Sequence, residues 1–174
     1  MSRTLLFLAS AALLASPATA DVREVGSRLE FFSPHASWAV AIPRDDWAIV
    51  QRKSRRDGTG FYYLVASRSH SLQFSIYLDR TAQCASGAAC RALFWSNPGP
   101  MFRDAQDVRQ YERNGFHVLQ FYLDGVGGIP IMQTNLSAHT YRDGYWIDIR
   151  ITKVGEQVPD PAPMIEFLDS ISVQ

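Results

Sequence analysis

The sequence lacks an excess of charge of either sign. Its 174 residues include 17 lysines and arginines and 17 aspartates and glutamates, so the formal net charge at pH 7 is zero. Binding to nucleic acid or to an anionic membrane surface requires a basic excess, and this composition argues against both partners. No apolar run reaches the roughly 20 residues that a membrane-spanning helix needs. We therefore predict no nucleic-acid partner and no integral membrane segment.

Motifs for phosphate or metal binding are missing as well. The glycine-rich residues 125–130 are not followed by Gly-Lys-Ser/Thr, so they do not form a phosphate loop. The four histidines are scattered, without the short spacings that place two ligands on one face of a helix or strand: His35, His70, His117 and His139. We predict no cofactor and no metal, and we assign no catalytic residue.

Residues 1–20 have the features of a signal peptide. Arg3 gives a positive start, residues 5–14 are apolar, and Ala18-Thr19-Ala20 is a small-x-small cleavage site. We expect residues 1–20 to be removed on export. Residues 21–174 are then expected to form a single domain that is periplasmic or secreted.

Only two cysteines are present, Cys84 and Cys90. An exported chain favours a disulfide between them. On an α-helix, residues six apart would lie about 240° apart around the axis and about 9 Å apart along it, too far to bridge. The bond therefore predicts that the intervening segment is at least partly a loop. The spacing is not CxxC, so a structural role is favoured over a metal or redox role.

The strongest local signal is Asp143-Gly144, a pair favoured in two-residue type I′ hairpin turns. Its register opposes Tyr141 to Trp146, His139 to Asp148, and Ser137 to Arg150. We call the sheet face that carries these residues the polar face. The alternate residues are mostly apolar, and we expect them to cover the core: Leu136, Ala138, Thr140, Tyr145, Ile147, Ile149 and Ile151.

Further alternating segments extend this picture. Asn114-Gly115 is a second type I′ signal, and residues 38–79 read as an antiparallel meander. Asp160-Pro161 can begin a closing amphipathic helix. We predict one α+β domain, with a single antiparallel sheet of about six to eight strands and flanking helices.

Three segments carry a family resemblance. They are residues 38–43 (WAVAIP) followed by Trp47, the Asn114-Gly115 hairpin with residues 116–122, and residues 145–151 together with 164–171 (MIEFLDSI). The chain resembles the PsbP-like domain family in these places. The resemblance implies an antiparallel sheet sandwiched by helices and a binding or assembly role rather than catalysis. The disulfide loop departs from the family pattern, and no functional residue is carried over.

The polar face is the predicted functional surface, since aromatic side chains among polar ones favour contact with a partner or ligand. Its predicted binding residues are His139, Tyr141, Trp146, Asp148 and Arg150. We predict an exported, non-enzymatic binding or accessory/assembly module whose partner is a protein or a small ligand.

Alternatives remain open at this point. Ser137, His139 and Asp148 are the residue types of an activated nucleophile in a hydrolase. Against this, a serine in the middle of a flat strand has neither a strained elbow nor an evident pair of oxyanion donors. His139 and Asp148 with Asp79 would make a weak metal site. An immunity-type inhibitor of a toxin is a third alternative.

Overall fold

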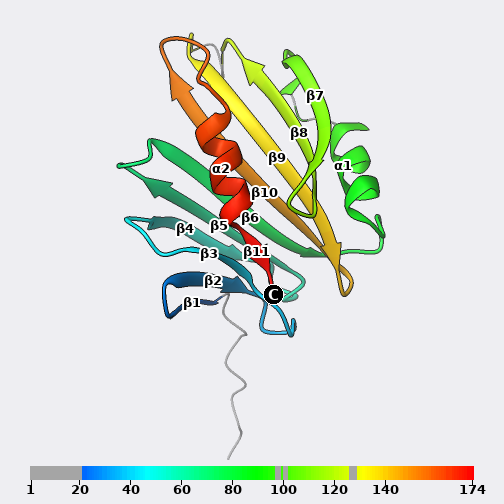
Figure 1. The fold of residues 1–174 in the computed structure, drawn as a ribbon. Coiled ribbons are helices and arrows are strands. Elements are labelled where there is room, and N and C mark those ends of the chain that lie inside the picture. Colours follow the sequence, from blue (N-terminus) through cyan, green and yellow to red (C-terminus); the bar gives the residue numbers. More distant parts are fainter. Residues whose placement is uncertain (1–20, 97–98, 100–101, 126–128) are drawn as a thin grey trace, which may run out of the picture.

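The computed structural model describes residues 21–96, 99, 102–125 and 129–174. The predicted signal peptide lies outside these residues. Within them the chain forms two antiparallel sheets (Figure 1). The larger has seven strands in the order β4 (Ala48–Ser54), β5 (Gly60–Ser67), β6 (Leu72–Arg80), β10 (Tyr145–Gly155), β9 (Met132–Arg142), β8 (Phe116–Leu123) and β7 (Gln106–Arg113). The smaller has four, in the order β1 (Asp21–Val25), β2 (Arg28–Phe32), β3 (Val40–Pro43) and β11 (Ser172–Val173).

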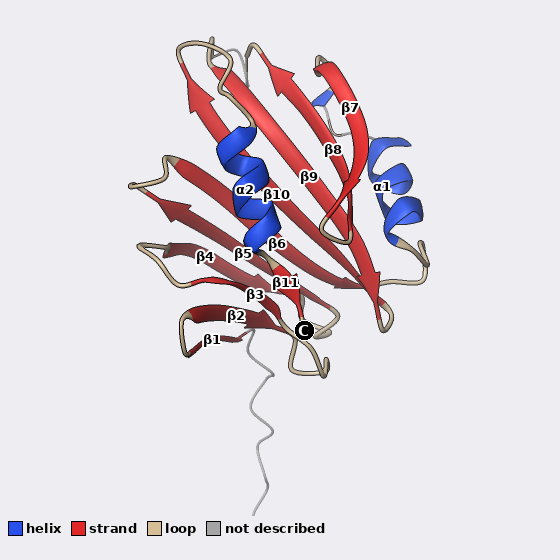
Figure 2. Ribbon diagram, viewed as in Figure 1, coloured by secondary structure: helices blue, strands red, loops and turns tan. Residues whose placement is uncertain are grey.

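The predicted single-sheet α+β fold is wrong. The described residues are mostly β, with two helices, α1 (Gly87–Ser96) and α2 (Ala162–Ser170), beside eleven strands (Figure 2). The error began at Pro43, because β3 pairs with β2 and β11 rather than continuing the meander into β4. Strands as short as β3 and β11 carry too few residues for alternation to reveal which sheet they join.

Both predicted type I′ hairpins are confirmed. Asp143 and Gly144 have φ values of 49° and 84°, and Asn114 and Gly115 have values of 49° and 75°. The β9–β10 register opposes Tyr141 to Trp146, His139 to Asp148, and Ser137 to Arg150, as predicted. Because alternate side chains point to opposite faces, this register fixes which residues share the polar face.

The main core lies on the apolar face of the larger sheet. Ile147, Ile149 and Ile151 of β10 are fully buried there, as the alternation predicted. The smaller sheet covers this face together with α2, which Figure 1 shows lying across the larger sheet. The core side chains of the covering layer include Phe31, Val40, Ile42, Met164, Phe167 and Leu168. A second sheet thus buries much of the surface that helices were expected to cover.

The other helix, α1, packs on the polar face, against β8 and β9. Its ring contacts reach Phe121 and His139, which alternate with core residues along their strands. The predicted disulfide joins Cys84 to Cys90, and α1 begins inside that loop at Gly87. A Cβ on Gly87 would lie 2.6 Å from Cδ2 of His117 and 2.8 Å from the backbone oxygen of His139. Only glycine permits this close approach without displacement of a neighbour.

Among the described residues, no helix is long and apolar enough to cross a membrane.

Candidate functional site

One row of ionisable side chains crosses the whole polar face, with one residue from each of the seven strands. In strand order from β4 to β7 it consists of Lys53, Tyr62, Tyr77, Asp148, His139, His117 and Glu112. Residues paired directly across neighbouring strands point to the same face, with Cβ atoms about 5 Å apart. The exposure of each residue in this row therefore shows where the polar face is covered and where it is open, from β4 to β7.

Helix α1 covers one half of this row. His139 is fully buried, and the Phe94 ring lies 5.1 Å from its imidazole. His117, one strand further, keeps 25% side-chain exposure and lies 3.3 Å from Glu112. The predicted binding residue His139 is therefore covered by α1 and has no exposed surface.

The protonation of His139 follows from its surroundings. Burial lowers its pKa and outweighs the opposing charge of Asp148, so the imidazole is neutral. The indole N–H of Trp146 donates to its Nδ1 at 3.1 Å. An accepting Nδ1 requires the proton of the neutral ring to sit on Nε2. Nε2 is buried without a hydrogen-bond partner among the described residues.

This tautomer is the opposite of the one a Ser-His-Asp nucleophile needs. In that arrangement the carboxylate accepts from Nδ1–H, while Nε2 takes the proton of the serine. Here Nδ1 already accepts from Trp146, and Asp148 Oδ1 lies 3.5 Å from it. Ser137 is itself only 2% exposed. The hydrolase alternative therefore has no geometric support at these residues.

Asp148 instead holds Arg150. The Nε and Nη2 groups of Arg150 donate to Asp148 Oδ2 at 2.8 and 2.6 Å. The guanidinium lies 4.6 Å from the Tyr77 ring centre and 4.7 Å from that of Phe94. Burial acts to lower the pKa of Arg150, but the charge and hydrogen bonds of Asp148, with smaller contributions from Tyr77 and Tyr62, leave it raised. The cation is thus fixed in place at the border of the region that α1 covers.

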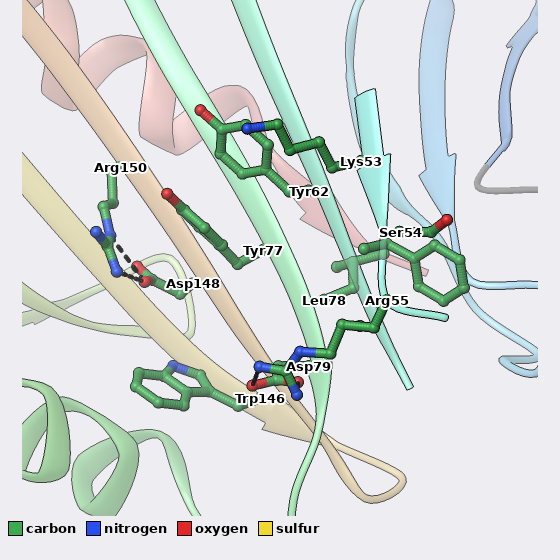
Figure 3. Close-up of a pocket in the computed structure, with 12 residues that line it drawn as sticks. Lys53, Ser54, Arg55, Tyr62, Tyr77, Leu78, Asp79, Trp146, Asp148 and Arg150 are labelled. Carbon is green, nitrogen blue, oxygen red and sulfur yellow. Dashed lines mark hydrogen bonds and ion pairs between the residues drawn. The ribbon is translucent and has the colours of Figure 1, made fainter. Parts of the chain in front are cut away.

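Beyond this border the polar face is open and hollowed (Figure 3). A cavity of about 400 Å³, which we call the Trp146 pocket, lies over β4, β5, β6 and β10. Its lining includes Lys53, Arg55, Tyr62, Tyr77, Asp79, Trp146, Asp148 and Arg150. The three aromatic side chains are half-buried, so part of each ring surface remains available.

Two details define the walls of the Trp146 pocket. The rings of Tyr62 and Tyr77 lie 4.7 Å apart at 45°, and burial raises the pKa of Tyr62, with a smaller contribution from Tyr77. Arg55 pairs with Asp79 at 2.8 Å on the opposite side, a pair that Figure 3 marks with dashed lines. Burial nonetheless raises the pKa of Asp79, against the effect of Arg55. Each carboxylate of the pocket is therefore matched with one guanidinium.

The five predicted binding residues are split by this geometry. Trp146, Asp148 and Arg150 line the Trp146 pocket. His139 lies behind Trp146 under α1, and Tyr141 lines a separate hollow with Asn114 and Val173.

The sequence reasoning missed the other wall of the pocket. Tyr62, Lys53 and Arg55 come from β4, β5 and their connection. Tyr77 could be placed on the polar face of its own strand. What was missing is the β6–β10 pairing, which sets Tyr77 opposite Asp148 and Asp79 opposite Trp146.

One cluster of possible metal ligands occurs among the described residues. The ligand atoms of Asp45, Asp46 and His70 lie within 4.8 Å of one another, and all three residues are exposed. His70 Nε2 already lies 2.6 Å from Asp45, while Asp46 accepts from Ser67 and from the backbone N–H of Ser69. Each group is satisfied within the protein, so the cluster does not indicate a metal centre. The combination of His139, Asp148 and Asp79 does not form such a cluster.

Comparison with known proteins identifies a structure with a similar fold but no family to which the sequence can be assigned. No family model matches the sequence, and no curated protein matches it. Its structure is similar to a protein of Bacteroides thetaiotaomicron VPI-5482 solved at 1.50 Å, with a TM-score of 0.52 and 13% identity. The likeness covers 83% of this chain and 48% of that one, so the chain spans about half the length of that protein. This likeness concerns the fold alone, and the PsbP-like resemblance stays a prediction.

Proposed function

We propose that this protein is an exported, non-enzymatic module that binds a ligand in the Trp146 pocket. The observation that carries the proposal is the pocket itself, in which three aromatic side chains and two arginine–carboxylate pairs surround a cavity of about 400 Å³. Cavities of roughly 300–1,000 Å³ with an aromatic lining and a few fixed polar groups are the usual form of small-molecule sites.

Preorganisation supports binding at this place. Arg150 is held by the two hydrogen bonds that it donates to Asp148, and its guanidinium lies over the rings of Tyr77 and Phe94. Trp146 is anchored through its indole N–H on His139. Side chains that are already ordered lose little conformational entropy when a ligand arrives, so more of the contact energy appears as affinity.

The same contacts argue against catalysis. A general base needs a free lone pair within reach of the substrate. The imidazole of His139 is enclosed under α1, both carboxylates of the pocket are paired with arginines, and the unbonded Oδ1 of Asp148 is buried. Binding therefore accounts for this arrangement better than proton transfer does.

Export is part of the proposal on two grounds. The Cys84–Cys90 disulfide is formed, and such bonds persist in oxidising compartments. The signal-peptide pattern of residues 1–20 points to the same periplasmic or secreted location. A binding or assembly role is also what the PsbP-like resemblance implies. No observation on the described residues favours the inhibitor alternative.

A fragment screen by NMR tests the proposal. Small anionic, cationic, neutral polar and aromatic compounds are added to the labelled protein, and the indole signal of Trp146 is identified by its loss in Trp146→Ala. We expect at least one compound to shift that signal and to lose binding in Trp146→Ala but not in Tyr141→Ala, the control outside the pocket. Compounds that bind Trp146→Ala as well as wild type, or a screen without any shift at the pocket, would remove it as the site.

A further inference from the structure

A second cavity adjoins the Trp146 pocket at Arg150. This second hollow, of about 660 Å³, lies on the far side of this residue and shares it as a lining residue. On β10, Trp146 and Asp148 line the first cavity, and Thr152 and Val154 line the second. On β6, Tyr77 and Asp79 line the first cavity, and Gln73 and Ser75 line the second. The two cavities adjoin at Arg150 along β6 and β10, and we call them together the trough. From Trp146 to Val154 it extends roughly 26 Å at the rise of a β-strand.

The second hollow is lined by neutral groups. Its polar lining consists of amides and hydroxyls besides Arg150: Ser71, Gln73, Ser75, Gln133, Asn135, Ser137 and Thr152. Some of these are oriented by the protein, since Thr152 and Gln133 both donate to Asn135 Oδ1, at 3.1 and 2.7 Å. Arg150 is the only charged residue among the lining residues described there. This part of the trough suits an uncharged ligand that is rich in hydrogen-bonding groups.

The first cavity also disfavours a charged ligand. An anion that approaches Arg150 or Arg55 also comes close to the carboxylate paired with that arginine. A cation that approaches Asp148 or Asp79 likewise comes close to the paired guanidinium. A charged ligand would have to lose its hydration next to a side chain of like charge. This desolvation costs more free energy than the attraction to the oppositely charged side chain provides. Lys53 at the exposed edge is the one cation of this lining without a carboxylate partner in the described structure.

We infer that the trough binds the chain of a neutral oligosaccharide, an inference that rests on the proposed binding function. A sugar ring has an apolar C–H face that packs on an aromatic ring and a rim of hydroxyls that pairs with fixed planar groups. Trp146, Tyr62 and Tyr77 supply such rings, while the Arg150–Asp148 pair and the amides supply planar donors and acceptors. The elongated shape suits several linked rings rather than one.

Two other ligand classes fit less well. A flat heterocycle prefers a parallel slot, but the rings of Tyr62 and Tyr77 are tilted by 45°. A peptide that binds by adding a strand pairs its backbone with a free sheet edge. The trough instead lies over β6 and β10, which are inner strands of the larger sheet.

Affinity electrophoresis tests the inference. The protein is run in gels that contain hydroxyethylcellulose, arabinoxylan, galactomannan, dextran or glycogen as neutral polymers, and alginate or polygalacturonate as acidic ones. Oligosaccharides of increasing length, made from any polymer that retards the protein, are then titrated by calorimetry. We expect retardation by at least one neutral polymer and an affinity that increases with oligomer length.

Variants locate the bound chain. Trp146→Ala is expected to weaken binding about tenfold or more, the usual loss for a buried aromatic anchor. Gln73→Ala, at the exposed far end of the trough, should weaken long oligomers and leave short ones unchanged. Tyr141→Ala, outside the pocket, should stay within about twofold of wild type, and salt should have little effect because no net charge is neutralised.

Three outcomes overturn the inference. Retardation by acidic polymers alone, with loss in Lys53→Ala, would show an anionic ligand. If fragments bind the Trp146 pocket but no neutral polymer or oligomer binds, the inference of a saccharide ligand is refuted and the proposed binding function remains. The absence of both fragment and saccharide binding would refute the two together.

Discussion

The two halves of the polar face end in opposite states, and one of them carries the apolar cluster of Leu119, Phe121 and Leu123 on β8. Over β8 and β9, α1 packs against the sheet and leaves His139 without exposure. Over β5 and β6 nothing equivalent packs among the described residues, and Tyr62 and Tyr77 stay half-buried around a cavity. The row from Lys53 to Glu112 crosses both halves. Chemistry on a sheet face is thus decided by what packs on it as much as by which residues it carries.

The difference also sets protonation and charge. In the covered half, burial keeps His139 neutral and turned toward Trp146. In the open half, the arginines keep exposed surface, 60% of the Arg55 side chain and 29% of that of Arg150, while Asp148 keeps only 4%. Trp146 and Arg150 connect the two, because each contacts a residue of the covered half and also lines the pocket. The following predictions test this division.

The largest effect is expected at the border. Asp148→Ala leaves the Arg150 cation in a largely enclosed place without its carboxylate, and we expect a loss of about 3 kcal/mol in urea unfolding. This expected loss is at the lower end of the range for breaking a buried ion pair, because the Arg150 side chain keeps 29% exposure. The matched control is Asp79→Ala in the rim pair, where Arg55 is 60% exposed. Its loss should stay within about 1 kcal/mol. Equal losses would show that the border pair is no more buried than the rim pair.

A smaller effect is expected from the disulfide. Replacing both Cys84 and Cys90 by serine reopens a seven-residue loop and should cost about 2 kcal/mol in the chain-entropy model. Because the loop holds the start of α1, amide exchange should accelerate in α1 and in β8 beneath it, and remain unchanged in β5 and β6. Uniform acceleration over the larger sheet would contradict the independence of the two halves.

A pH-dependent effect should come from His139. Burial holds its folded-state pKa below the ordinary value of 6.5, and Arg150, Arg91 and His117 act in the same direction against the pull of Asp148. Below pH 6.5 the unfolded chain therefore binds a proton that the folded chain resists. The contribution of His139 to the unfolding free energy is fully present above that pH. It falls as the pH decreases toward the folded-state pKa, by at most about 1.4 kcal/mol per pH unit.

His139→Gln removes this titration. The difference in unfolding free energy between wild type and His139→Gln, measured from pH 8 to pH 5, should become less favourable to wild type as the pH falls. A difference that is independent of pH would show that the pKa of His139 is the same in the folded and unfolded chains. Trp146 fluorescence should change in wild type alone as the pH falls through the folded-state pKa of His139, since a protonated Nδ1 no longer accepts from the indole.

The smallest effect is expected at Tyr141. It faces Trp146 across the hairpin but lines a different hollow. Tyr141→Ala should leave the unfolding free energy within about 0.5 kcal/mol and ligand binding unchanged. Loss of binding in this variant would extend the site to the whole hairpin face and remove the distinction between the halves.

Local sequence signals predicted the hairpins well. Asp143-Gly144 and Asn114-Gly115 specify their turns through residues that tolerate positive φ, and the side-chain period of two then determines every pair on the strands. The closing helix was also predicted, one residue away from its observed cap at Pro161. The fold class was not, because β1, β2 and β11 are short and pair outside the larger sheet.

The candidate site was predicted in part for the same reason. Trp146, Asp148 and Arg150 lie on one strand, so alternation alone placed them together. Tyr62, Tyr77 and Lys53 join them through the β4–β5–β6–β10 pairing. No local signal specifies which strand pairs with β6 after a gap of more than sixty residues.

By itself, the sequence determined the two hairpins, their registers and the disulfide, since each depends on residues close together in the chain. Only the tertiary structure decided which half of the polar face is open. That choice depends on Phe94 and Trp95 of α1 packing against Leu119 and Phe121 of β8, contacts between distant segments that bury apolar surface over β8 and β9 and leave the Trp146 pocket uncovered.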